Sequence, residues 1–371
     1  MKRLFALILF AAMLLSSAAL AETTITPDMK LKVSKPSFTA NNPVIEGEDP
    51  ITGLPVDSSV VYTPILLVLD GSEGAYPHWG VESASAIIQI PNQSTTQTKL
   101  LALFTSEYPD LAGGTRSARM PSLVWANVFN SAYVAAGGPP IDTGNSCPVS
   151  VHYWRAKWGI KSQQAENPQE RRWFDMLGND SLKERTPLLP QPNNLLIYIS
   201  KIHEKLIENG VPFEKRPFLF TDEPLTRGDE ATTITMDYSK NNAASCTFVY
   251  SEAIGGYRRK SNMGKASEQV FDYNYDRATE NTLVFSNVVV IRENFKFDYS
   301  TGTGYPYAVD NFVGGGQADI FQCGRYIKGS WYRDGLYGRL IVMDDEGNEL
   351  QFQRGVTFFA FNDEKCAISY E

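Results

Sequence analysis

One continuous apolar run, Ile65-Leu66-Leu67-Val68-Leu69, closed by Asp70-Gly71, most constrains how this chain can fold. A strand with one solvated face alternates apolar and polar side chains, so an unbroken run indicates a strand that is buried on both faces. Apolar runs at 84–90, 100–104 and 133–136 predict further strands. The first half of the chain is therefore expected to contain a covered sheet.

Two segments, one between these strands and one after them, have sequence patterns that are typical of helices. A helix is predicted at 122–131, directly after a proline. Four apolar residues repeat at intervals of 4, 3 and 4, the period of a helix face: Leu195, Ile199, Ile202 and Leu206. We expect Asn193 and Asn194 to cap this second helix and Gly210 to end it. Strands and helices together predict a mixed α/β sheet domain over 60–230.

The pattern changes near residue 232. Little of the later sequence has a helical period, and the turn between 343 and 349, Asp344-Asp345-Glu346-Gly347-Asn348, is typical of a hairpin. The fold class is thus α+β or α/β, with a mainly antiparallel β domain over 240–371 and a boundary near 225–245. The runs that predict its strands are 246–250, 282–291, 338–343, 349–352 and 356–361.

The N-terminus has the order of a secretory signal peptide. Lys2 and Arg3 precede an apolar run, and small residues end in Ala19-Leu20-Ala21. The run is shorter than the roughly 20 apolar residues of a spanning helix. We therefore predict a signal peptide over 1–21, cleavage after Ala21 and an extracytoplasmic protein. Residues 22–59 are expected to form an extended leader, with ordered packing from Tyr62.

The charge of the chain excludes two classes of partner. Loss of Lys2 and Arg3 with the signal peptide takes the formal net charge from −8 to −10, because residues 1–21 contain no acidic residue. An acidic chain without a run of lysines and arginines is a poor match for nucleic acid or for an anionic membrane surface. No later segment is long and apolar enough to span a membrane.

The cysteine count permits disulfides without deciding them. Cys147, Cys246, Cys323 and Cys366 allow three pairings in an exported chain. Cys323 and Cys366 are the preferred pair because they share the C-terminal segment, and buried free thiols are the alternative. No two lie at the C-x-x-C spacing of a structural zinc site.

Known catalytic patterns find little support. The three histidines, His78, His152 and His203, form no H-E-x-x-H motif, and no phosphate-binding loop or G-x-S-x-G elbow is present. Asp142-Thr143-Gly144 resembles the turn of aspartic proteases, but that chemistry needs two carboxylates and no second copy exists. We expect no cofactor, no metal site and no assignable catalytic residue.

The strongest constellation is Gly113-Gly114-Thr115-Arg116-Ser117-Ala118-Arg119, just before the predicted helix at 122–131. Arg116 and Arg119 on a turn that leads into a helix suit a carboxylate, sulfate or phosphate group. The alternative is that they pair with Glu107 or Asp110 and only hold the loop. The candidate ligand-binding residues are Asp70, Lys99, Arg116, Ser117 and Arg119.

These residues also carry a family resemblance. The chain resembles the YerB-like lipoprotein family, a two-module family of unknown function, and this implies an envelope location and two consecutive modules. The family's lipid-anchored Cys is absent, as is its acidic stretch with Glu-Gly-Gly, and its His-Gly-Gly-Ser is matched only by Ala136-Gly137-Gly138-Pro139. The matching stretches are 49–55, the strand ending at 70, 100–104, 116–119, 194–210, 250–251, 257–258, 287–290, 329–331 and 347–350.

The leading hypothesis is a non-catalytic binding or scaffolding protein of the cell envelope. Its N-terminal domain is expected to present a polar cleft to an anionic or wall-derived ligand, or to another envelope protein. The alternative is a hydrolase of cell-wall material that uses Asp70 or Asp142 and requires a carboxyl group with a raised pKa. A purely structural module with an exposed apolar patch is a third possibility.

Overall fold

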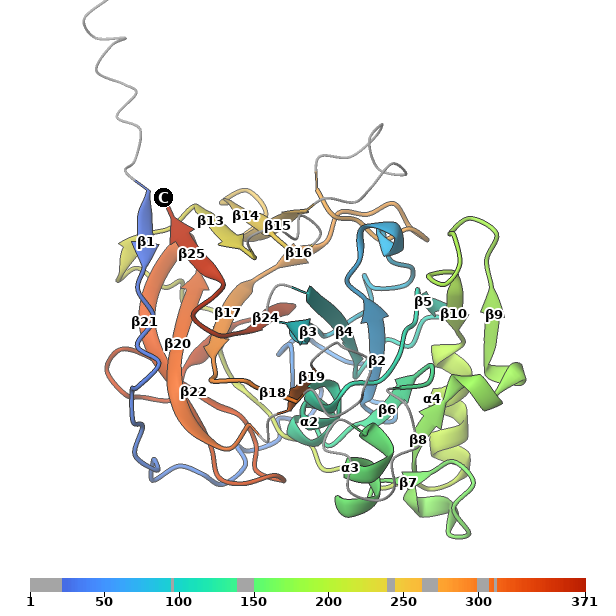
Figure 1. The fold of residues 1–371 in the computed structure, drawn as a ribbon. Coiled ribbons are helices and arrows are strands. Elements are labelled where there is room, and N and C mark those ends of the chain that lie inside the picture. Colours follow the sequence, from blue (N-terminus) through green and yellow to red (C-terminus); the bar gives the residue numbers. More distant parts are fainter. Residues whose placement is uncertain are drawn as a thin grey trace, which may run out of the picture.

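The computed structural model describes residues 22–94, 97–138, 150–238, 244–261, 273–298, 307–309 and 312–371. Its regular structure is mostly β-sheet with few helices (Figure 1). The α-helices of the described residues are α2 (Met120–Val128), α3 (Val151–Lys157) and α4 (Ile199–Glu208). Short 3₁₀ turns are η1 (Glu73–Ala75), η2 (Pro168–Glu170), η3 (Met176–Gly178) and η4 (Asp180–Leu182).

A long central sheet contains strands from both halves of the sequence. Its order is β12-β21-β20-β17-β24-β3-β4-β2-β6-β8-β7, and β22 pairs with β21. The halves meet where β24 pairs in parallel with β3, with Phe358 opposite Ile87. The bounds are β12 (Asp229–Glu230), β21 (Arg325–Arg333), β20 (Gly314–Gln322), β17 (Asn287–Arg292), β24 (Thr357–Asn362), β3 (Ala86–Ser94), β4 (Gln97–Phe104), β2 (Ile65–Asp70), β6 (Ala132–Ala135), β8 (Arg171–Asp175), β7 (Lys161–Ser162) and β22 (Ile341–Met343).

A six-stranded sheet lies beside the central one, in the order β1-β25-β13-β14-β15-β16. Within the described residues, three small sheets complete the β-structure. The six-stranded sheet comprises β1 (Thr23–Ile25), β25 (Ala367–Tyr370), β13 (Thr233–Asp237), β14 (Cys246–Ser251), β15 (Gly256–Ser261) and β16 (Val284–Phe285). The small sheets are β5 (Ala112–Gly113), β10 (Leu195–Ile197) and β9 (Lys183–Arg185); β11 (Leu219–Thr221) and β23 (Gln351–Gln353); and β18 (Lys296–Asp298) and β19 (Tyr307–Val309).

The central sheet separates two apolar cores, which explains the unbroken apolar run of β2. Leu66 and Val68 face the core that contains α2, whereas Leu67 and Leu69 face the core that contains the six-stranded sheet and α4. All four leucine and valine side chains are fully buried. The prediction of a strand covered on both faces is therefore confirmed.

One sheet of the fold runs across the predicted division of the chain. The strands of the central sheet that lie between 60 and 230 belong to a sheet that does not end at the predicted boundary near 225–245. It continues through β24, β17, β20 and β21 of the later half. The pairing of β24 with β3 covers an edge that would otherwise expose unpaired backbone groups.

Two local predictions are wrong. The helix expected from Leu195 starts only at Ile199, because Leu195–Ile197 forms β10 between β5 and β9. Asn193 and Asn194 therefore do not cap it, and Tyr198 holds the position before α4. Ordered packing also begins before Tyr62, since β1 pairs with β25 and Ile51 is fully buried.

The preferred disulfide is wrong as well. Cys323 lies in the turn between β20 and β21 of the central sheet, whereas Cys366 immediately precedes β25 of the other sheet. Both are free thiols, as is Cys246. Cys147 and Asp142 lie outside the described residues. Within the described part of the chain, no helix is long and apolar enough to cross a membrane.

Candidate functional site

The carboxyl ends of several strands meet at one edge of the central sheet. β6 is parallel to β2, β8 is parallel to β6, and β3 runs with β2 because both are antiparallel to β4 (Figure 1). Asp70 is the last residue of β2 and lies opposite Lys99 on β4. Such strand ends are where ligands tend to bind in mixed and parallel sheets.

The segment 113–118 lies along the ends of β2 and β6. Arg116 N–H donates to Val68 O at 3.1 Å, and Ala136 N–H donates to Arg116 O at 3.0 Å, so the segment bridges the two strands where they separate. Gly114 is required there, because a Cβ would lie 1.9 Å from Asn193 O. The glycine pair thus lets the chain approach closely enough to place Arg116 beside Asp70.

We define the strand-end cluster as Asp70, Lys99, Arg116 and Arg119. Arg116 Nε lies 2.8 Å from Asp70 Oδ2, as a close ion pair without directed hydrogen-bond geometry. Arg119 stands immediately before α2 and donates from Nε to Asn92 Oδ1 at 2.5 Å. The alternative partner Asp110 instead accepts from Ser200 Oγ.

Three of the five predicted site residues are thus joined by contacts or strand register, and two are held differently. Asp70, Lys99 and Arg116 meet at the sheet edge. Arg119 approaches through Asn92, a residue that the sequence reasoning missed as a site residue although it follows the predicted strand at 84–90. Ser117 is half-buried, and its side chain makes no hydrogen bond within the described residues.

Burial and neighbouring charge act in opposite directions on Asp70. Burial raises the pKa of its carboxyl group, but the Lys99 ammonium, the Arg116 guanidinium and the Ser72 backbone N–H lower it further than burial raises it. Its net pKa therefore lies below the ordinary value. An ionised carboxylate of this kind can hold a cation in place but does not meet the raised pKa expected of a general acid.

Lys99 is the unusual member of the cluster. Its side chain is buried, with 3% of the residue exposed. Burial lowers the pKa of its ammonium to about 7, and the nearby positive charges of Arg119 and Arg116 contribute, while Asp70 opposes them. No described residue forms a hydrogen bond or a close ion pair with the Lys99 amine. The site therefore holds a buried lysine whose amine lacks a direct partner among the described residues.

His78 supports the cluster from behind. Its Nε2–H donates to the backbone oxygen of Asp70 at 2.7 Å, and its ring is buried. Burial lowers its pKa to about 4, so the imidazole is neutral near pH 7. This geometry gives His78 a role in positioning the end of β2.

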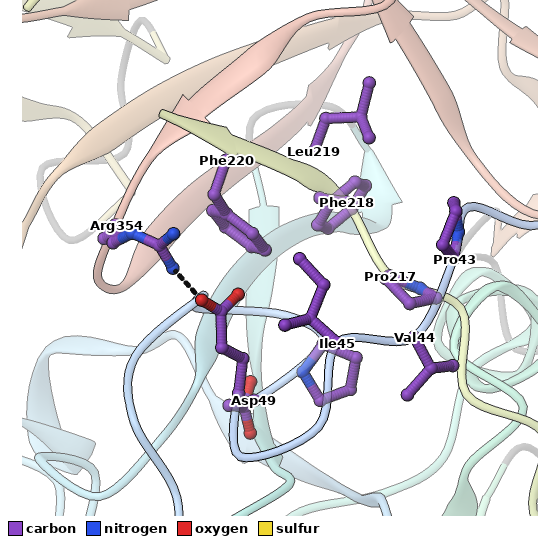
Figure 2. A pocket seen from close by; sticks show the side chains of 11 residues that line it. Pro43, Val44, Ile45, Asp49, Pro217, Phe218, Leu219, Phe220 and Arg354 are labelled. Atoms are coloured by element: carbon purple, nitrogen blue, oxygen red, sulfur yellow. Dashed lines mark ion pairs between the residues drawn. The ribbon is translucent and has the colours of Figure 1, made fainter. Parts of the chain in front are cut away.

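A hollow of about 170 Å³ lies where residues 43–50 pass residues 217–220 (Figure 2). Its wall is largely apolar, and Figure 2 shows Phe218, Phe220 and Ile45 around it. Arg354, the cation at its rim, is paired with Glu48 at 3.1 Å. The volume is below the roughly 300–1,000 Å³ of typical ligand pockets.

A more open hollow of about 550 Å³ is lined by residues 221–227 and by the segment around the β22–β23 turn. Its cation, Arg227, is also compensated, by Asp344 at 2.9 Å. Neither hollow adjoins the strand-end cluster, so the predicted polar cleft remains a prediction. Within the described residues, no group of three or more His, Cys, Asp or Glu side chains is placed to hold a metal ion.

Comparison with known proteins covers both halves of the chain. Residues 51–209 match the N-terminal domain model, and residues 234–359 the C-terminal domain model, of a protein family of unknown function, DUF3048. A curated protein of Bacillus subtilis (strain 168), described as putative lipoprotein YerB, is 24% identical over 314 residues, which are 83% of this chain and 84% of that protein. The crystal structure of YerB from Bacillus subtilis superposes with a TM-score of 0.67 at 22% identity, covering 86% of this chain and 99% of that one. At this sequence identity, the similarity between the two structures shows a common fold and nothing more.

Proposed function

This chain belongs to the YerB-like family built from the two DUF3048 domains, and we propose that it is a non-catalytic, extracytoplasmic binding protein. Its strand-end cluster would bind the carboxylate, sulfate or phosphate group of an envelope-derived ligand. The chemistry follows from the residue types, since arginines and lysines at strand ends and before a helix recognise oxyanions.

One observation carries this proposal: Lys99 is a buried residue, and its amine has no hydrogen-bonding or ion-pairing partner among the described residues. A buried ammonium is unfavourable unless an opposite charge lies close to it. An oxyanion beside Lys99 would supply that charge and also accept hydrogen bonds from it. Arg116 can reach the same ligand, because about a third of its side chain is exposed (34%) although it already contacts Asp70.

The state of Asp70 favours binding over hydrolysis. Its lowered pKa keeps the carboxylate ionised, and the ion pair with Arg116 occupies it. An ionised carboxylate cannot donate the proton that a leaving group needs. Asp70 is better suited to orient Arg116 toward a ligand.

The proposed location rests on the N-terminus and on the family. Residues 1–21 have the basic, apolar and small-residue order of a cleaved signal peptide. A relative is described as a putative lipoprotein, which is an envelope class of protein. An anionic wall fragment or another envelope protein would then be available as a partner.

The test is a thermal-shift titration of the mature protein with inorganic phosphate, sulfate and wall fragments. A ligand at 100 times its Kd stabilises the native state by about 2.7 kcal/mol. We expect a rise in Tm that Lys99→Met and Arg116→Ala lose. Lys328→Ala, at an exposed lysine of β21, is the matched control and should keep the full response.

Two outcomes would contradict the proposal. In one, none of these compounds raises Tm. In the other, a rise occurs equally in wild type, Arg116→Ala and Lys328→Ala, which would indicate unspecific binding of anions. Circular dichroism of each variant separates loss of binding from loss of folding.

A further inference from the structure

A further, smaller cavity lies on the opposite face of the strands that carry the strand-end cluster. It has a volume of about 20 Å³ and is bounded by Leu69 of β2, Leu100 of β4 and Phe358 of β24. Its polar wall consists of Tyr76, Arg259 and Asn274, with His78 beside them. About 10–15 Å³ of such volume holds one water-sized particle, so the cavity fits a single small occupant.

Arg259 of β15 is a buried cation whose charge is not compensated by a carboxylate. Only 2% of the residue is exposed. Its Nη1 donates to Asn274 Oδ1 at 2.8 Å and to Ser261 Oγ at 3.0 Å, both neutral groups. Its Nε and Nη2 atoms are buried and make no well-directed hydrogen bond, and the Tyr76 hydroxyl and the Cys246 thiol lie beside the guanidinium. Among the described residues, no Asp or Glu forms an ion pair with this guanidinium.

The other polar residues of the cavity add donors. The Tyr76 hydroxyl is buried beside the guanidinium and makes no well-directed hydrogen bond, and Asn274 Nδ2 is buried without a hydrogen-bond partner. Because Asn274 Oδ1 accepts from the guanidinium, the orientation of the amide is set, and Nδ2 is the group left over. The Nε2–H of His78 is used by the backbone oxygen of Asp70. Three residues that line one cavity thus hold four buried donor atoms that make no well-directed hydrogen bond.

We propose that this cavity is a binding site for one small monovalent anion, chloride being the natural occupant, held by Arg259, Tyr76 and Asn274. A buried charge is strongly destabilising unless it is paired. A chloride ion supplies the missing negative charge and accepts hydrogen bonds from several directions at once. A water molecule would leave the charge uncompensated, and the cavity is too small for an organic anion.

The Cys246 thiol is the alternative counter-charge, since it lies next to the guanidinium. Burial raises the pKa of this thiol above its ordinary value, and the attraction of Arg259 does not reverse the shift. The thiol therefore remains protonated at neutral pH. Burial likewise raises the pKa of Tyr76, so its hydroxyl stays a donor.

Such an ion would join two parts of the fold. Arg259 comes from the six-stranded sheet, whereas Tyr76 follows η1 beside the end of β2. An anion between them would act as a structural group that links the six-stranded sheet to the central one. The expected consequence is a folded state whose stability depends on halide concentration.

The test uses the mature protein in sodium gluconate, an anion too large for the cavity, with chloride replacing gluconate at constant ionic strength. For a chain of this length, we expect Tm to rise by about 2 °C for each tenfold increase in chloride once the site fills. Arg116→Ala should keep this response, which separates the cavity from the strand-end cluster. A Tm that does not change with chloride would overturn the proposal.

Arg259→Met should lose the chloride response, and three further measurements keep the proposal testable if this variant fails to fold. Tyr76→Phe retains the cation and removes one donor, so its chloride response should need a higher concentration. A crystal soaked in bromide should show an anomalous peak among the three lining residues; solvent density without that peak would contradict the assignment. Cys246→Ser should respond as the wild type does, and a halide response that only this variant shows would identify the thiolate as the counter-charge instead.

Discussion

Replacing Lys99 with methionine should stabilise the ligand-free protein near neutral pH. Methionine has a similar length and no charge, so it can fill the same space in the buried side of the sheet. The variant removes an ammonium that burial disfavours, and Asp70 retains its contact with Arg116 at 2.8 Å. A residue kept for binding rather than for folding is expected to behave in this way.

The size of the effect follows from the pKa of Lys99. That pKa is about 7 in the folded protein and 10.5 in the unfolded chain, so between these values the unfolded state binds one proton more. The free energy of unfolding then rises with pH, by about 1.4 kcal/mol per pH unit. The destabilisation by Lys99 is gone only above the unfolded pKa of 10.5. At pH 7 the buried lysine destabilises the wild type by at most about 4 kcal/mol. Lost attraction between Lys99 and Asp70 reduces the net gain in the variant.

Urea denaturation of wild type and Lys99→Met at several pH values from 7 to 10 measures this difference. The free energy of unfolding of the variant should exceed that of the wild type most at pH 7, and the excess should shrink as pH rises. Saturating phosphate should also reduce it, because a bound anion favours the charged lysine. An excess that is constant across this pH range, or a less stable variant at pH 7, would refute the reasoning.

Three further predictions concern the rest of the molecule. The pKa of His78 is about 4 in the folded state and 6.5 in the unfolded state, so the free energy of unfolding should fall by about 3 kcal/mol as pH drops from 6.5 to about 4. The amide of Gln can still donate a hydrogen bond, so denaturation curves of His78→Gln should lack that loss. Arg292→Met should lower the free energy of unfolding by about 3–5 kcal/mol, because it leaves the buried Asp319 carboxylate, 2.8 Å from Arg292 Nε, without its counter-charge. A double variant that also carries Asp319→Leu should recover part of the loss in urea denaturation. Mass spectrometry of the exported protein should find Glu22 as its first residue, and a mass that retains the preceding residues would reject cleavage after Ala21.

Several local elements could be predicted because neighbouring residues decide them. The apolar run at 65–69 forms β2 with both faces buried, and the turn at 344–348 closes as expected, with Asp344 N–H donating to Asn348 O. Leu195–Ile197 shows the limit of this reasoning. A short apolar run fits a strand or a helix equally well, and its pairing with β5 and β9 made it a strand.

The candidate site could be predicted only in part. The glycine pair and Arg116 pointed to an anion site, and Asp70 was placed at a strand end by the pattern alone. That Asp70 faces Lys99 depends on the register of β2 with β4. That Arg116 contacts Asp70 rather than Asp110 depends on the passage of 113–118 along two strand ends.

The sequence by itself determined the export signal prediction, the family, the buried nature of β2 and the residue types available for an anion. The family follows from the order of short matching stretches along the chain, and the other three follow from composition or from residues close together in the sequence. The tertiary structure alone decided that β24 joins β3 in one sheet, that Cys323 and Cys366 stay apart, and that Arg259 lines a small cavity together with Tyr76. These features depend on contacts between residues far apart in the sequence, where many pairings satisfy the same local pattern and only the packing of the whole chain selects one.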